Sequence, residues 1–126
     1  MAAGITKVSA PEIYDLTQSG GTVLIDVRQP EEWKQTGVPE GARLISMRHP
    51  EGGAGFLRDV RSAVGGDANR PIAIICRTGN RSAAVSRALS DAGFTHIFDV
   101  SEGMAGSGDG PGWIKRGLPT KSCASC

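Results

Sequence analysis

Short apolar runs that alternate with helical patterns make up most of the first hundred residues. The segment 22–27 is apolar from Val23 until Asp26, which is typical of a strand buried on both faces of a parallel sheet. Three further runs, 44–47, 72–76 and 97–100, also predict strands. Strands are therefore expected along the chain at intervals long enough to hold a helix.

Helical signals lie between these runs. Ser9 and Glu12 have the spacing of a capping box, so a helix is expected to start there, turn Ile13 and Leu16 inward and stop at the glycines 20–21. Further helices are predicted over 30–33, 56–64 and 81–92. Strands and helices in alternation predict an α/β fold with a mainly parallel sheet.

The last quarter of the chain has weaker patterns. Residues 101–112 include five glycines and are expected to form a surface loop. Residues 113–116 predict a final helical turn, and the segment from Lys121 reads as a polar, mobile tail. We therefore expect one domain over residues 1–119, followed by a C-terminal tail over 120–126.

Charge and composition narrow the classes of function. The chain has 126 residues with 14 basic and 13 acidic side chains, a balance that indicates neither a nucleic-acid nor a membrane partner. No apolar stretch is as long as a membrane span, and the start lacks the layout of a secretion signal. Three cysteines leave at least one free thiol, which suits a reducing compartment. We therefore expect a soluble, cytoplasmic protein.

Cys76 is the strongest chemical signal. It closes the run 72–76 and precedes a predicted helix, so its thiol is expected to meet loop N–H groups and the positive end of a helix dipole. Both features favour a thiolate, which is a nucleophile. The alternative is a buried, inert cysteine that ends a core strand. The cationic, glycine-containing turn that follows favours the nucleophile; it reads Arg77, Thr78, Gly79, Asn80, Arg81 and Ser82.

The segment 76–82 resembles the C-x-x-G-x-R-S active loop of single-domain rhodaneses, which are sulfurtransferases. Residues 24–33 resemble the family's L-I-D-V-R-x-x-x-E-aromatic element, and Gly103-Met104 with the later Trp113 resembles its G-G-M-x-x-W ending. Residues 38–42 fall where the family commonly has G-H-I-P-G-A, but Val38 replaces the histidine and one extra residue is present. The resemblance implies a rhodanese-like fold with a mainly parallel five-stranded sheet and helices on both faces.

The same resemblance implies a reaction and a set of site residues. Cys76 would take the outer sulfur of thiosulfate or a related sulfane-sulfur donor as a persulfide, and pass it to cyanide, a small thiol or a protein thiol. Substrate binding would fall to the loop residues 77–82, and Asp26 and Arg28 would support the loop. No metal or organic cofactor is required.

Two other functions remain open at this stage. Phosphatases and arsenate reductases of the same fold also use a cysteine in an anion-binding loop, but typically with C-x5-R spacing. Here four residues separate Cys76 from Arg81, which favours a smaller pocket. A non-enzymatic rhodanese-like interaction module is the second alternative, although such modules usually lack the cysteine.

Cys123 and Cys126 form a C-x-x-C motif in the tail. This spacing is found in redox dithiols and in half of a zinc site, but the sequence offers no second pair of metal ligands. The remaining interpretations are a pair of thiols that helps to unload the Cys76 persulfide and a passive, exposed tail.

Overall fold

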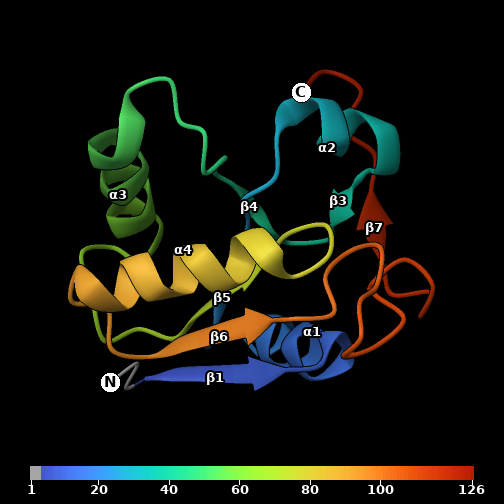
Figure 1. Ribbon diagram of the computed structural model, residues 1–126, viewed down its shortest axis with the longest axis horizontal. Helices are drawn as coiled ribbons and strands as arrows, with labels where there is room; N and C mark the ends of the chain where they lie inside the picture. The colour runs from blue at the N-terminus through green and yellow to red at the C-terminus, as the bar shows by residue number, and fades with distance from the viewer. Residues whose placement is uncertain (1–3) are drawn as a thin grey trace.

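The computed structural model describes residues 4–126, and its centre is a five-stranded sheet in which every neighbouring pair is parallel (Figure 1). The strand order is β1-β6-β5-β2-β4. The strands are β1 (Ile5–Val8), β2 (Val23–Asp26), β4 (Arg43–Leu44), β5 (Ile72–Ile75) and β6 (Ile97–Val100). The predicted parallel α/β architecture is confirmed.

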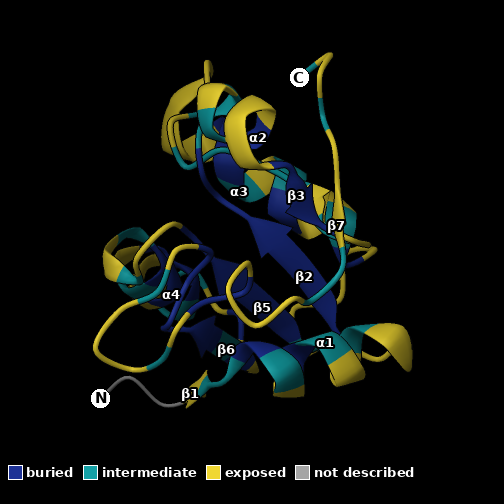
Figure 2. Ribbon diagram, turned by 90° about the vertical axis from the view of Figure 1, so that its right-hand side faces the viewer, coloured by how far each residue is buried: buried dark blue, intermediate teal, exposed yellow. Residues whose placement is uncertain are grey.

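Helices cover both faces of this sheet. Side chains of alternate strand residues point to opposite faces, so Ile72 and Ile74 pack with α3 (Gly52–Ala63) and α4 (Asn80–Asp91). Ala73 and Ile75 pack on the other face, against α1 (Ala10–Gln18) and the buried Trp113. Figure 2 shows the central strands as the most deeply buried part of the molecule.

A second, two-stranded sheet was not expected. Antiparallel strands β3 (Val38–Pro39) and β7 (Thr120–Lys121) pair beside the short helix α2 (Pro30–Thr36). The prediction of a mobile tail from Lys121 is therefore corrected at its first residue, because that residue lies in β7. The pairing brings the C-terminal segment back next to α2 (Figures 1 and 2).

Other elements differ from the predictions in detail. The edge strand β1 was not predicted, and the expected strand 44–47 is reduced to β4, although Ile45 and Met47 still donate to carbonyls of residues 26 and 27. Leu16 is exposed rather than turned inward, because α1 buries Ala10 and Ile13 and packs Tyr14 partly against the same core. Residues 113–116 form turns instead of a helix, and the glycine-rich loop begins with buried residues 101–104.

Candidate active site

Cys76 lies directly after β5, with its side chain almost fully buried at the start of α4. Its Sγ accepts hydrogen bonds from two backbone N–H groups, Gly79 at 3.1 Å and Ser82 at 3.3 Å. The N-terminus of α4 faces the same sulfur, so backbone dipoles converge on one atom. This arrangement is suited to stabilising a negative charge on the sulfur.

The loop keeps this shape because a second segment lies close against it. Gly79 has a φ of +95°, and a Cβ there would collide with the Ser101 carbonyl oxygen. Gly103 has a φ of +69°, and a Cβ there would collide with the Arg77 carbonyl oxygen. Met104 N–H donates to the Cys76 carbonyl at 2.9 Å, so the segment after β6 forms one wall of the loop.

Ser82 connects the loop to Asp99, which was not among the predicted site residues. The Ser82 hydroxyl lies 2.7 Å from Asp99 Oδ1 and 3.1 Å from the Gly79 carbonyl oxygen, and both side chains are buried. Burial raises the pKa of Asp99, while Ser82 and Lys7 partly oppose that increase. Asp99 thus contacts Ser82, one of the two residues whose N–H groups contact Cys76.

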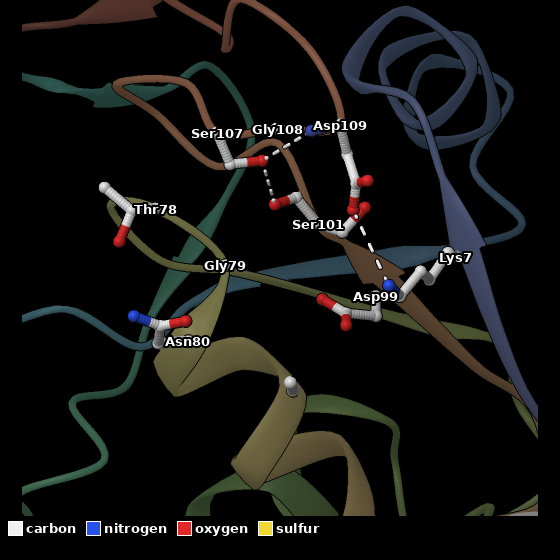
Figure 3. A pocket seen from close by; sticks show the side chains of 10 residues that line it. Lys7, Thr78, Gly79, Asn80, Asp99, Ser101, Ser107, Gly108 and Asp109 are labelled. Atoms are coloured by element: carbon white, nitrogen blue, oxygen red, sulfur yellow. Dashed lines mark hydrogen bonds and ion pairs between the residues drawn. The ribbon is translucent and has the colours of Figure 1, made fainter.

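A polar cavity of about 260 Å³ lies beside this support (Figure 3). The loop residues Thr78, Gly79 and Asn80 line it, together with Asp99 and Ser101. Asp109 of the glycine-rich loop forms an ion pair with the exposed Lys7 at 3.6 Å on its rim. The glycine-rich loop is therefore part of the surroundings of the active loop.

Arg81 is held by Glu32 of α2. Its two terminal guanidinium nitrogens donate to the two carboxylate oxygens at 2.7 and 2.8 Å. The hydrogen bond from Arg81 lowers the pKa of Glu32 and offsets the effect of partial burial. Arg81 was predicted to bind substrate, which stays a prediction, and its guanidinium has a bidentate protein partner in this structure. Glu32 was not selected from the sequence, because 49 residues separate it from Arg81.

Asp26 and Arg28 form a second, fully buried ion pair. Arg28 donates to both oxygens of Asp26, with the shortest bond at 2.8 Å, and also to Thr36 Oγ1 and the Gly37 carbonyl oxygen. The side chains are 0% and 1% exposed. Their direct contacts are with the end of α2, the helix that also carries Glu32.

A smaller cavity, about 180 Å³, opens between α2 and the active loop. Arg77, the exposed residue after Cys76, lines it together with Arg28 and Glu32. Met104, Ala105 and Ile114 supply an apolar side. We refer to this space, lined also by Gln35 and Thr36, as the entrance cavity.

Glu102 is another buried carboxylate that the sequence did not reveal. It accepts from Ala10 N–H at 2.9 Å, from Gly112 N–H at 2.8 Å and from Arg116 Nε at 2.6 Å. Burial would raise the pKa of Glu102, but Arg116 and the two backbone donors lower it below its usual value. The carboxylate therefore ties α1 to the loop that forms the wall of the active site.

We expect Glu102→Gln to destabilise the protein by about 1–3 kcal/mol at pH 7, because the carboxylate accepts three hydrogen bonds and the amide that replaces it carries no charge. The lowered pKa of Glu102 determines how the free energy of unfolding changes with pH. The stabilisation is present above the usual value of 4.5 and is lost as the pH falls through the lower, folded-state pKa. Urea unfolding of both proteins from pH 3 to 7 measures this, with the exposed Glu31→Gln as control. If the stabilities of Glu102→Gln and of the unaltered protein change with pH in the same way, this role of Glu102 is contradicted.

The structure brings most of the predicted site residues together in one loop. Gly79 and Ser82 contact Cys76 through their N–H groups, whereas the side chains of Arg77, Thr78 and Asn80 are exposed on the outside of the loop. Cys123 and Cys126 are joined by a disulfide in the tail. Within residues 4–126, no group of three His, Cys, Asp or Glu side chains is arranged to hold a metal ion, and no helix is long and apolar enough to cross a membrane.

Comparisons with known proteins agree with this geometry. Residues 9–107 match the family model for the rhodanese-like domain. A protein of Rickettsia prowazekii, RP600, is 26% identical over 118 residues, which cover 91% of this chain and 96% of that protein. The thiosulfate sulfurtransferase GlpE of Pseudomonas syringae is 27% identical over 94 residues, or 75% of this chain and 79% of GlpE.

Among solved structures, the polysulfide-sulfur transferase homodimer of Wolinella succinogenes superposes with a TM-score of 0.72 at 26% identity. The match covers 97% of this chain and 82% of that one. The family match extends over most of the chain and includes β2, the Cys76 loop and β6. The chain therefore belongs to the family of rhodanese-like domains, as a relative of sulfurtransferases.

Proposed function

We propose that this protein is a sulfurtransferase that carries sulfur as a persulfide on Cys76. The observation that carries the proposal is the pair of N–H groups, from Gly79 and Ser82, that converge on Cys76 Sγ. In the first step the thiolate attacks the outer sulfur of thiosulfate, the S–S bond breaks, and sulfite leaves with the bonding electrons. The same N–H groups stabilise the anionic persulfide that remains.

In the second step a thiophilic acceptor removes the outer sulfur and restores the thiolate. Cyanide would leave as thiocyanate, and a thiol of a small molecule or protein would become a persulfide. Both half-reactions proceed without a metal or organic cofactor. The entrance cavity offers the route for such small reactants, because Arg77 lines it immediately beside the nucleophile.

The length of the loop favours sulfur transfer over phosphate ester hydrolysis. Four residues separate Cys76 from Arg81, one fewer than in the C-x5-R loops typical of phosphatases, which favours a smaller pocket. Glu32 also engages both terminal nitrogens of Arg81. The retained cysteine with its two N–H donors also favours an enzyme over an interaction module.

Intact mass spectrometry tests the proposal directly. The reduced protein is mixed with thiosulfate, desalted and weighed, while free sulfite is measured in the same sample. We expect one added sulfur atom on the peptide that contains Cys76 and an equal amount of sulfite. Sulfite release without an added sulfur, or brisk hydrolysis of aryl phosphates, would contradict the assignment.

We expect Arg77→Ala to raise the KM for thiosulfate several-fold with a smaller effect on kcat. Arg77 is exposed at the rim, so it attracts the dianion before the sulfur atom is transferred. Because salt screens such attraction, the difference from the unaltered protein should shrink at high ionic strength. Steady-state kinetics at low and high salt measure both effects, with Arg87→Ala on the exposed side of α4 as control. An unchanged KM would remove Arg77 from donor binding.

A further inference from the structure

The C-terminal segment leaves the protein core at the rim of the entrance cavity. Lys121 in β7 pairs with Val38, and Gly37 packs so closely against it that a Cβ on Gly37 would lie 2.9 Å from the Lys121 carbonyl oxygen. The preceding residue, Thr36, lines the entrance cavity together with Arg77. The last strand, β7, thus places the start of the tail next to the entrance cavity, which Arg77, the residue directly after Cys76, also lines.

The tail beyond β7 carries two cysteines on an otherwise small-residue segment. Cys123 and Cys126 form a disulfide, and Cys126 N–H donates to the Cys123 carbonyl at 3.2 Å. The remaining tail residues, Ser122, Ala124 and Ser125, are exposed. Once the disulfide is reduced, Cys126 can move on five residues of chain, which extend to roughly 17 Å from Lys121. Reduction therefore produces a tethered dithiol that starts at the entrance cavity.

We propose that this dithiol is a built-in reductant that converts the Cys76 persulfide into free sulfide. The inference rests on the proposed sulfurtransferase function and adds a second activity to it. Cys126, which has the longer tether, attacks the outer sulfur of Cys76–S–SH, so that Cys76 regains its thiolate and Cys126 becomes the persulfide. Cys123 then attacks the Cys126 Sγ, the S–S bond to the terminal sulfur breaks, and hydrosulfide leaves.

The electrons balance within the chain. The two tail thiols lose two electrons and become the Cys123–Cys126 disulfide, while the transferred sulfur gains two electrons and leaves as hydrosulfide. The disulfide of the structure is the oxidised product of this cycle. A small dithiol or thiol in solution resets the tail by thiol–disulfide exchange. The redox state of the tail thus selects the product: a reduced tail releases sulfide, and an oxidised tail leaves the persulfide for an external acceptor.

A single-turnover experiment tests the inference. The protein is fully reduced, freed of reductant without oxygen and mixed with one equivalent of thiosulfate. We expect one equivalent each of sulfite and sulfide, with the tail cysteines recovered as a disulfide. Once the Cys76 persulfide has formed, the first-order rate constant of sulfide release should not change over a tenfold range of protein concentration, because this step is intramolecular. Full sulfite release with a lasting Cys76 persulfide and a reduced tail would overturn the inference and leave the proposed function intact.

Single variants establish the order of the two thiols. Cys126→Ser should hold the sulfur on Cys76, and Cys123→Ser should accumulate it on Cys126, as located by peptide mass mapping; both should lower sulfide release at least tenfold. Ser125→Ala is the matched control and should behave like the unaltered chain. A Cys76–Cys126 disulfide in Cys123→Ser would overturn attack at the outer sulfur. Absence of sulfite in every variant would instead overturn the proposed function.

Discussion

Cys76→Ser should reduce thiosulfate:cyanide sulfur transfer by roughly three orders of magnitude or more, because a hydroxyl forms no persulfide and is a poor nucleophile at neutral pH. The fold should remain intact, since a serine oxygen still accepts hydrogen bonds from Gly79 and Ser82 N–H. Thiocyanate formation and intact mass after thiosulfate exposure measure the loss. Near-identical urea unfolding curves would show that the loss is chemical.

The appropriate control removes the other two thiols. Cys123→Ser with Cys126→Ser leaves Cys76 as the sole cysteine of the chain and should retain sulfite release with thiosulfate. Substantial sulfur transfer by Cys76→Ser would place the nucleophile elsewhere. Loss of sulfite release in the double tail variant would also show that the nucleophile is not Cys76.

The parts of the structure that could be predicted are those with a local cause. Strands β2 and β5 are buried on both faces, so β5 is apolar throughout and β2 is apolar up to its last residue, Asp26. The Cys76 loop was found for a similar reason, because a nucleophile, a glycine with positive φ and a helix start follow one another along the chain. The capping box of α1 formed as expected between Ser9 and Glu12.

The parts that could not be predicted depend on distant partners. Strand β1 has the polar residues Thr6 and Lys7 at its centre and exists through pairing with β6, more than ninety positions later. Likewise, β7 has two exposed residues and forms only because β3 lies beside it. Local propensity carries no signal for such pairs.

The supporting carboxylates of the site were missed for the same reason. Glu102 bonds to backbone N–H groups 92 residues before it and 10 residues after it, and Asp99 bonds to Ser82 across 17 residues. The sequence does offer one general indication. Asp99 lies within β6 and Glu102 follows two residues after this strand, at the carboxyl edge of the sheet, where sites form in open α/β folds. That indication identifies candidates without giving their partners.

Asp26→Asn should cost about 3–5 kcal/mol of stability, the second large effect that we expect. The substitution leaves the Arg28 guanidinium charged, 1% exposed and without its counter-ion. Arg28 also donates to Thr36 and Gly37, so its displacement should loosen the end of α2 and the neighbouring β3–β7 pair. Urea unfolding at pH 7 measures the loss, with the exposed Asp15→Asn as the matched control.

A double variant separates the uncompensated charge from the loss of the carboxylate itself. Asp26→Leu with Arg28→Met removes both charges and fills the site with side chains of comparable size, so it should recover most of the stability lost in Asp26→Asn. The residual loss should reflect the buried Arg28 N–H, which loses its Asp26 acceptor, together with Gly37 and Thr36, which each lose one hydrogen bond from the Arg28 side chain. If Asp26→Asn proves no more destabilising than Asp15→Asn, the pair is not the anchor of α2, and support for the active loop must come from the Glu32–Arg81 contact alone.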